Sequence, residues 1–357
     1  MPVAIKIKEI ATKLSVSPAT VSRTLKGNYG RGATSLATAR RILNYCSRNG
    51  YLTKEDKDRV LLKMQIQASD KKIFCISCFE GLWNYNAIFS SVSRSLQNQG
   101  QYSGFFTVRS SSDLRRFPYD EAGVTLVFGR ITPDTYETLS EWGIPIVLGD
   151  SKIPESNWST VNSDNLDAVS RAVGILAGLG HERIAFMCRF EDFPCRTYNL
   201  HQRQNGYIVG MSDAGLSYDG LIITKDSENS YTPSTHDEVI SDLRQLAERV
   251  VLDPMPTAVV AANDSMAHIL RMVLREKGFR VPEDVSIIGY DGQHKIAGTM
   301  GLEPISTMVV NWEEMGQAMV DLAMALMLNP KSQVRHILIP ADYEDMGTVR
   351  PPRDQRV

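Results

Sequence analysis

The sequence is poor in cysteine, with five among 357 residues, and this odd number does not suggest a disulfide framework. It also lacks any run of about 18 uncharged apolar residues, so we expect no membrane-spanning helix. Residues 1–9 show a charged amphipathic pattern instead of the apolar stretch of a secretory signal. These absences predict a cytoplasmic protein without a membrane partner.

The sequence motifs of catalysis are missing as well. No Gly-x-x-x-x-Gly-Lys phosphate loop occurs, and the six histidines never show His-Glu-x-x-His spacing. Residues 210–214 lack the last glycine of a nucleophile elbow and fall within a helical pattern. Cys75 and Cys78 have the spacing of a zinc pair but no second pair, and their segment predicts a buried strand. We therefore expect no catalytic residue, no metal site and no cofactor.

Charge is distributed unevenly along the chain, although the net charge is only −2. Residues 1–63 hold 13 basic and 4 acidic side chains, whereas the remainder holds 26 basic and 37 acidic ones. A basic segment attached to an acidic body is typical of a nucleic-acid-binding domain joined to one that does not bind nucleic acid. A solvated basic surface is the alternative on charge alone.

The basic segment predicts three short helices. Apolar residues at positions 7, 10, 11 and 14 favour a first helix over 7–14, followed by a break at Ser15-Val16. Ser17 is suited to cap a second helix from Pro18 to about Leu25, which Gly27 ends. A third helix is expected from about residue 35 to 49, with Gly50 as its stop. Its core face comprises Ala39, Ile42, Leu43 and Cys46.

Two short helices around a tight turn, packed on a third, predict a helix-turn-helix domain whose second helix enters the DNA major groove. Arg23 can donate two hydrogen bonds to a guanine, and the hydroxyls of Thr20 and Ser22 suit phosphate oxygens. A three-helix element that binds protein is the alternative. The candidate DNA-binding residues here are Ser17, Pro18, Ala19, Thr20, Ser22, Arg23 and Asn28.

Several stretches make this segment resemble the start of a LacI/GalR-family transcriptional regulator. They are Ile7-Lys8-Glu9-Ile10-Ala11, the run from Val16 to Gly27, and Asn49-Gly50-Tyr51. The resemblance implies a DNA-binding domain over 1–52, a hinge or linker over 53–71, and a two-lobed effector-binding and dimerisation domain over 72–357.

The linker departs from the family pattern. In the family this segment places a leucine between base steps of the minor groove, a role that Leu61 or Leu62 would take here. Glu55, Asp56 and Asp58 would repel phosphate, however. A helical linker whose leucines pack on the partner subunit is therefore an open alternative, and residues 65–70 suggest a plain connector.

From residue 72 onward, short apolar runs alternate with helical patterns. This alternation predicts parallel sheets with helices on both faces, in two α/β lobes. Strands are expected at 73–78, 104–108, 125–128, 145–148, 183–187, 258–261, 285–289 and 337–339, and helices at 87–98, 166–179, 204–214, 236–250, 265–277 and 312–328. In such folds a ligand lies at the carboxyl ends of the strands.

The body resembles the same family over most of its length, in the runs 180–186, 256–267 and 281–291. The family's body is similar to periplasmic sugar-binding proteins and binds a small effector between its lobes. Arg203 takes the place of the family's ligand-holding arginine, and helix capping is the alternative role for Asp264 and for Asp291. The resemblance implies effector contacts at Asn84, Tyr85, Asp150, Ser163, Arg203, Asn263, Asp264 and Asp291.

Together these features predict a ligand-responsive repressor. It would bind a near-palindromic operator as a homodimer, with a tetramer as an alternative, under control of a sugar or sugar derivative. A cytosolic sugar-sensing protein whose N-terminal domain binds no operator is the rival hypothesis, and the linker acids favour it. An enzyme on the same α/β scaffold is disfavoured by the missing motifs.

Overall fold

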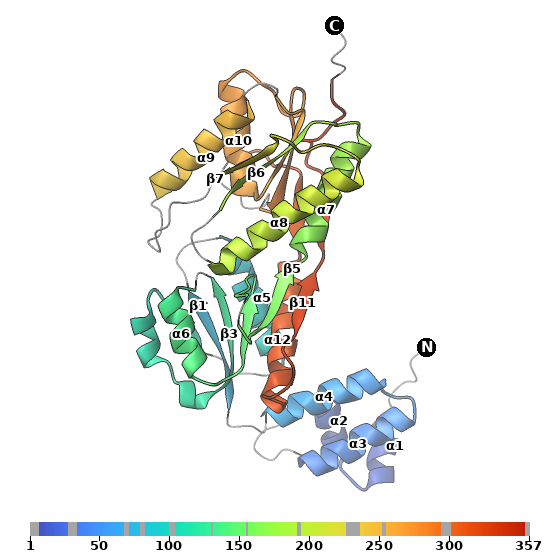
Figure 1. Cartoon of the computed structure of the whole chain (residues 1–357). Helices are drawn as coiled ribbons and strands as arrows, with labels where there is room; N and C mark the ends of the chain where they lie inside the picture. The colour runs from blue at the N-terminus through green and yellow to red at the C-terminus, as the bar shows by residue number, and fades with distance from the viewer. Residues whose placement is uncertain are drawn as a thin grey trace.

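The computed structural model describes residues 7–27, 34–67, 71–78, 83–99, 104–129, 131–154, 156–190, 194–225, 236–251, 255–293 and 301–353. A small helical domain lies at one end of an elongated body of two α/β lobes (Figure 1). Within these ranges no helix is both long and apolar enough to cross a membrane.

The three predicted N-terminal helices are confirmed as α1 (Ile7–Leu14), α2 (Pro18–Leu25) and α3 (Leu36–Arg48). The Ser17 side chain accepts a hydrogen bond from the Thr20 backbone N–H at 3.0 Å, so it caps α2 as expected. Gly27 adopts φ +66°, a left-handed conformation suited to ending a helix at glycine. The four predicted core residues of α3 are all buried.

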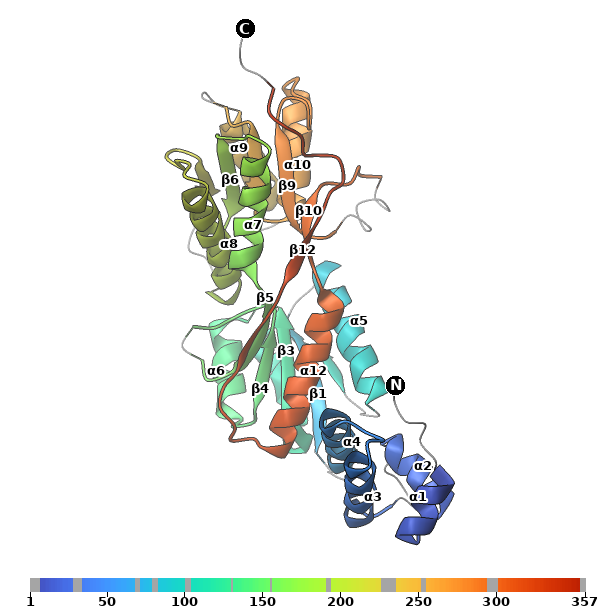
Figure 2. The same cartoon turned by 90° about the vertical axis from the view of Figure 1, so that its right-hand side faces the viewer.

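The linker forms one continuous helix, α4 (Lys54–Gln67). Thr53 begins it, because its hydroxyl accepts a hydrogen bond from the Asp56 N–H at 3.0 Å and donates one to the Asp56 carboxylate at 2.8 Å. The expected plain connector is therefore wrong for residues 65–67, which continue the helix. α4 packs against α3 and against α12 (Trp312–Leu328) of the body (Figures 1 and 2).

The first lobe is built on a six-stranded sheet in the order β11-β5-β4-β3-β1-β2, and every neighbouring pair is parallel. α5 (Trp83–Asn98) and α12 pack together in this lobe, which also holds α6 (Pro133–Glu141) and the short 3-10 helices η1 (Ser111–Arg116) and η2 (Tyr119–Glu121). The strands are β1 (Lys72–Cys78), β2 (Phe105–Thr107), β3 (Ala122–Gly129), β4 (Ile146–Gly149), β5 (Ser159–Ser163) and β11 (His336–Ile339).

The second lobe repeats the design with the order β12-β10-β9-β8-β6-β7. Its helices are α7 (Asn165–Gly178), α8 (Pro194–Asp213), α9 (His236–Val250) and α10 (Asp264–Glu276). The strands are β6 (Ile184–Arg189), β7 (Ile222–Lys225), β8 (Ala258–Ala261), β9 (Ser286–Asp291), β10 (Thr307–Val310) and β12 (Ala341–Glu344). The expectation of purely parallel sheets is wrong at one edge, where β12 runs antiparallel to β10 because the chain returns there from the first lobe.

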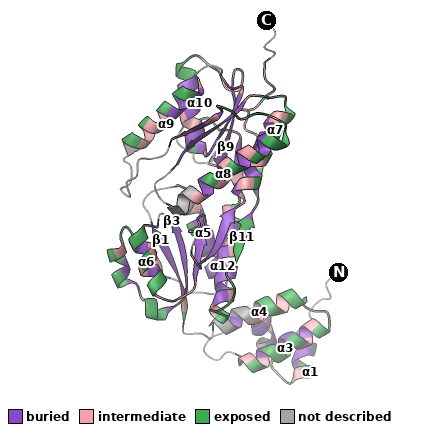
Figure 3. Ribbon diagram, in the orientation of Figure 1, coloured by how far each residue is buried: buried purple, intermediate pink, exposed green. Residues whose placement is uncertain are grey.

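The chain passes between the lobes three times, after β5, after β10 and after β11 (Figure 2). The first and third passages touch, since the Asp164 N–H donates to the Ile339 carbonyl at 2.8 Å. The central strands of both sheets are buried between helices whose outer faces are exposed, whereas the edge strands β2, β11 and β12 are partly exposed (Figure 3). The carboxyl ends of β5 and of β9 consequently lie close together, where a ligand cleft is expected.

Most predicted elements of the body are present, and several are longer than expected. α8 begins at Pro194, ten residues before the predicted start. α6 and the strands β5, β7, β10 and β12 were not predicted. The sequence of β5 is Ser-Thr-Val-Asn-Ser. Its polar residues lack the apolar pattern that predicts a buried strand, although β5 is buried along its whole length.

Candidate functional site

The outer face of α2 holds the candidate DNA-binding residues. Pro18, Ala19 and Arg23 are exposed, and Thr20 and Ser22 are half-buried. Val21 faces the core, so the helix turns its polar side to solvent. Arg23 Nε donates to the Ala19 carbonyl at 3.3 Å. Ser17 is exposed at the N-cap, and Asn28 lies outside the described residues.

The linker leucines are only partly placed. Leu61 is half-buried in α4, and the side chain of Leu62 lies outside the described residues. Met64, one turn further along, is completely buried. The insertion of Leu61 or Leu62 into DNA therefore stays a prediction.

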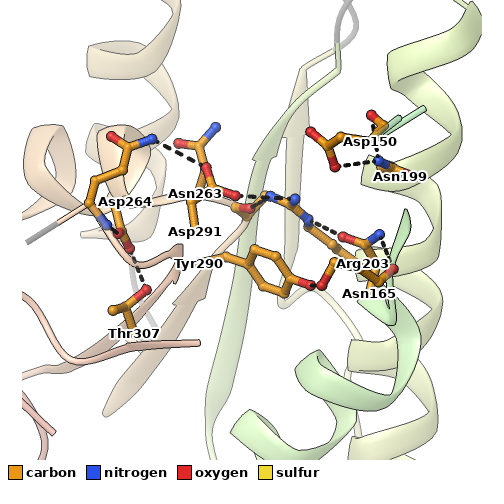
Figure 4. Close-up of polar contacts among 12 residues, drawn as sticks. Asp150, Asn165, Asn199, Arg203, Asn263, Asp264, Tyr290, Asp291 and Thr307 are labelled. Carbon is orange, nitrogen blue, oxygen red and sulfur yellow. Dashed lines mark hydrogen bonds and ion pairs between the residues drawn. The ribbon is translucent and has the colours of Figure 1, made fainter. Parts of the chain in front are cut away.

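Five candidate effector residues lie at the carboxyl ends of strands from the two lobes, and Figure 4 shows four of them, Asp150, Asn263, Asp264 and Asp291. Asp150 follows β4 and Ser163 ends β5 in the first lobe. Asp291 ends β9 in the second lobe, and Asn263 and Asp264 follow β8 there. Asp150 and Asp291 have φ angles of +50° and +107°, which strain the backbone of residues other than glycine.

Arg203 of α8 is at the centre of this group, with only 5% of its surface exposed. Its Nε donates to Asn165 Oδ1 at 2.7 Å and its Nη1 to the Ala262 carbonyl at 2.5 Å. Its Nη2 lies 3.3 Å from Asp291 Oδ1, and the guanidinium lies 3.7 Å from the centroid of the Tyr290 ring. Burial by itself would lower the pKa of Arg203, but Asp291 and further negative neighbours hold that pKa above its usual value.

Asp264 is buried beside this network. It accepts hydrogen bonds from Thr307 Oγ1 at 2.7 Å and from the Gln293 N–H at 2.6 Å. Burial, together with the charge of Asp291, raises the pKa of Asp264 to about 7. Helix capping is the wrong role for Asp264, because Asn263 caps α10 by accepting from the Met266 N–H at 2.8 Å.

Two side chains of the first lobe bond directly to the second. Ser163 Oγ lies 2.7 Å from the Tyr290 hydroxyl. Asn199 Nδ2 of α8 donates to the carbonyl and to the carboxylate of Asp150, at 3.0 and 3.1 Å. Side chains of the two lobes thus bond to each other at the carboxyl ends of the strands.

Sequence reasoning missed three members of the network, Asn165, Asn199 and Tyr290. Tyr290 lies within the run 281–291 that resembles the family. A fully buried aromatic residue is expected in the hydrophobic core, so Tyr290 was not proposed for the site. Asn199 lies before the predicted start of α8, so no pattern pointed to it. The side chains of Asn84 and Tyr85, in the first turn of α5, lie outside the described residues and are not placed in the cleft.

The arrangement suits binding more than catalysis. Carboxylates, an amide oxygen and hydroxyls can accept hydrogen bonds from ligand hydroxyls, and a guanidinium can donate to them. The described residues contain no group of three or more His, Cys, Asp or Glu side chains that could hold a metal ion. Cys75 is buried and its pKa is raised by that burial, so its thiol stays protonated.

Comparison with known proteins agrees with this architecture. A family model described as a periplasmic binding protein-like domain matches residues 173–345. The transcriptional regulator CelR of Thermobifida fusca is 28% identical over 80% of this chain and 81% of its own length. The repressor CytR of Escherichia coli K12 is 27% identical over 81% of this chain and 80% of its own length.

Solved structures share the fold. A CelR–cellobiose complex superposes with a TM-score of 0.63 at 23% identity, covering 97% of this chain and all of that one. A LacI-family regulator from Enterococcus faecium with bound ribose gives 0.61 at 23% identity, covering 79% of this chain and all of that one. With the helix-turn-helix domain and the two lobes in place, the chain is similar over most of its length to transcriptional regulators such as CelR and CytR, and its second half matches a periplasmic binding protein-like domain.

Proposed function

We propose that this protein is a homodimeric repressor that binds a near-palindromic operator and responds to a carbohydrate effector in the cleft between its lobes. The observation that carries the proposal is the buried network around Arg203 at the carboxyl ends of the second-lobe strands. Hydrogen bonds between Ser163 and Tyr290 and from Asn199 to Asp150 connect it to the first lobe. A ligand at that place contacts both lobes, so its binding energy can change their relative position.

A carbohydrate is the ligand class that the cleft chemistry favours. Asp150, Asp291 and Ser163 offer acceptors, and Arg203 offers donors, which together suit vicinal hydroxyl groups. Relatives solved with cellobiose and with ribose support this choice. We assign effector contacts to these four residues and to Asn263, Asp264, Asn84 and Tyr85.

The N-terminal domain, residues 1–52, supplies the DNA contacts in this proposal. One helix-turn-helix covers a single half-site, so a dimer and a two-fold operator follow. Residues 53–71 connect it to the effector-binding and dimerisation domain, residues 72–357.

The test has two steps. Selection from genomic DNA identifies the operator, and thermal shift with cellobiose, ribose and other sugars identifies the effector. A ligand at 100 times its Kd stabilises the protein by about 2.7 kcal/mol, which thermal shift detects readily. We expect Arg203→Ala and Asp291→Ala to abolish the shift and to leave operator binding intact.

Arg244→Ala is the matched control, because Arg244 forms an exposed ion pair with Glu276 on the same lobe. If the ligand-induced shift persists in both cleft variants, the cleft assignment is wrong. If selection enriches no DNA while a sugar still shifts the melting temperature, the sugar-sensing alternative replaces the repressor.

A further inference from the structure

The two faces of the first-lobe sheet are covered unequally. α5 and α12, of 16 and 17 residues, pack on the face that presents Cys75. The opposite face, which presents Phe74, is covered by α6 and η1, of 9 and 6 residues (Figure 1). The Phe117 ring packs on Phe74 with a centroid distance of 5.2 Å and stacks on half-buried Trp142 at 4.6 Å. The aromatic core on this side therefore reaches the protein surface at Trp142.

A cavity of about 290 Å³ lies between η1, η2 and α6. This volume suits a single ring, because pockets for larger organic ligands begin at about 300 Å³. Tyr119 and Trp142 line the cavity, with ring centroids 6.2 Å apart and planes inclined by 24°, and 51% of Tyr119 is exposed. Hydroxyl groups of Ser111, Ser112 and Thr138 line it as well. The cavity thus combines aromatic surface with hydrogen-bonding groups.

The residues of this cavity are distinct from those of the cleft. η2, which holds Tyr119, directly precedes β3, and Trp142 lies in the turn before β4. Both rings are therefore near the amino ends of these strands, whereas the cleft residue Asp150 follows the carboxyl end of β4. The strands β3 and β4 are parallel, so the two rings and the cleft lie toward opposite edges of the sheet.

Arg115 gives the cavity a positive charge, and the described lining contains no acidic residue. The Arg115 side chain is exposed and forms no hydrogen bond or ion pair with another residue that the structure describes. The nearby Asp113 carboxylate accepts from the N–H groups of Arg109 and Ser110 at 2.9 and 3.3 Å, which lowers the pKa of Asp113. A guanidinium beside aromatic rings favours a ligand with an anionic group.

η2 also contacts the segment through which the linker enters the body. Lys71 Nζ donates to the Asp120 carbonyl at 2.6 Å, and Lys72 forms an ion pair with Glu121. Lys72 begins β1, and Asp120 follows Tyr119 directly. A ligand that restrains Tyr119 consequently restrains the residues that hold this segment.

We propose that the cavity is a second small-molecule site, which takes a single ring that carries one anionic group. The ring packs against Tyr119 and Trp142, and the anionic group bonds to the Arg115 guanidinium. Aromatic carboxylates and sugar phosphates share this chemistry. Occupancy restrains η2 and the start of β1, so the site acts on the linker from a place other than the cleft.

Binding at this site can be measured by fluorine NMR on the full chain labelled with fluorotryptophan. Among the four tryptophans, Trp142 lines the cavity, whereas Trp312 donates to the carbonyl of the cleft residue Asp291. Trp142→Phe and Trp312→Phe assign the two signals. The Trp142 signal reports on the cavity and the Trp312 signal on the cleft, so the test is independent of the operator and of the proposed effector.

The probes are benzoate and glucose 6-phosphate, each against its neutral counterpart, benzamide or glucose, and inorganic phosphate as an anion without a ring. We expect at least one ring anion to shift the Trp142 signal at millimolar concentration, and the neutral rings and inorganic phosphate to leave it in place. A shift with benzoate alone identifies an aromatic carboxylate as the ligand class. A shift with glucose 6-phosphate alone identifies a sugar phosphate, and a shift with both identifies the shared chemistry.

Arg115→Gln should raise the Kd obtained from the Trp142 signal about tenfold, as for the loss of a hydrogen bond to a charged group. Tyr119→Ala should raise the same Kd. Arg116→Gln is the matched control, because Arg116 is an exposed neighbour in η1 outside the cavity lining, and it should leave the Kd unchanged. Amide exchange in residues 119–125 and 72–75 should be slower in the saturated protein.

Three binding results would overturn the proposal. These are an unmoved Trp142 signal with both ring anions at millimolar concentration, equal shifts with the neutral counterparts or with inorganic phosphate, and a Kd that Arg115→Gln leaves unchanged. Amide exchange that stays the same in the saturated protein would overturn the action on the linker.

Discussion

Arg23 is the residue on which DNA sequence preference should depend most. It is exposed on α2, opposite the buried Val21, and its guanidinium can bond bidentately to guanine. We expect Arg23→Ala to reduce the ratio of operator to non-specific affinity about 10-fold or more, with residual non-specific binding. Titration of the selected operator and of a scrambled duplex at one salt concentration measures this ratio.

Lys26 provides the comparison, because it is exposed at the end of the same helix. A phosphate contact positions the protein without contacting base edges, so Lys26→Ala should weaken both duplexes equally. An unchanged affinity ratio in Arg23→Ala would remove Arg23 from the base-contacting residues.

Asp264 should make stability depend on pH. Its pKa of about 7 in the folded protein exceeds its ordinary value of 3.8, so between these pH values the folded state holds a proton that the unfolded state has lost. Stability should therefore fall as pH rises through this window, by up to about 4 kcal/mol over its whole width. Urea unfolding at pH 5 and pH 8 should show this fall in the wild type and a smaller one in Asp264→Asn. An equal pH dependence of stability in the wild type and in Asp264→Asn would contradict this prediction.

Gly289 has a related constraint. A Cβ at this position would overlap the Asp264 carboxylate, so no other residue fits beside that buried group. We expect Gly289→Ala to lower stability by about 1–3 kcal/mol, as overpacking does. Gly174→Ala in α7 meets no atom within 4 Å and should be neutral or stabilising by up to about 1 kcal/mol. Equal melting temperatures for the two variants would refute the argument.

Among the elements, those with a regular apolar repeat could be predicted, and those with polar sequences could not. α9 and α12 have the predicted limits, because apolar residues recur on one face of each. The first half of α8 is polar, and its structure depends on contacts with the other lobe, as at Asn199. Local periodicity contains no information on such contacts, which explains the late predicted start.

The same limit applies to the cleft. Arg203 and Asp291 could be proposed from their motifs, and the structure brings them together. Asn165 and Tyr290 could be identified only from the structure, because they contact Arg203 from separate elements. A sequence pattern can indicate a residue that matches a family, but not the partners that this chain supplies to it.

The acidic residues of the linker have a structural role that is not evident from their charge alone. Glu55 and Asp56 lie in the first turn of α4, where negative charge is favourable, and Asp56 bonds with the capping Thr53. We expect Thr53→Ala with Asp56→Ala to speed amide exchange in α4 about fivefold or more, as expected for a lost cap of about 1 kcal/mol. Hydrogen exchange over residues 54–67 measures it.

A change at Asp58 can distinguish the capping of α4 from the repulsion of DNA phosphates, because the exposed Asp58 side chain lies beyond the N-terminal cap of the helix. Asp58→Lys should leave exchange in α4 unchanged. If α4 approaches DNA, the same change should tighten binding and steepen the log–log salt dependence by about 0.9. An unchanged slope would place this turn of α4 away from the phosphates.

On the scale of the whole molecule, α12 contacts both the cleft and the linker. At its first residue, Trp312 Nε1 donates to the Asp291 carbonyl at 3.3 Å. Further along, it packs against α4, and the charge of Arg59 acts on Asp321. Burial raises the pKa of Asp321, whereas the hydrogen bond from Gln317 and the positive charge of Arg59 on α4 oppose that rise, so opposite charges lie on the facing sides of α12 and α4. A movement of the second lobe can thus reach the N-terminal domain through one helix.

We therefore expect Asp321→Lys to loosen α4 and to weaken the link between effector and DNA. Faster amide exchange in residues 54–67, with α3 unchanged, would report the loosening. The ratio of operator affinity with and without effector, which is typically 5–150-fold in allosteric proteins, should fall toward one. The exchange variant Arg59→Glu with Asp321→Lys restores opposite charges and should recover part of that ratio. If α4 is loosened and the ratio stays unchanged, the signal does not pass through the contact of α12 with α4.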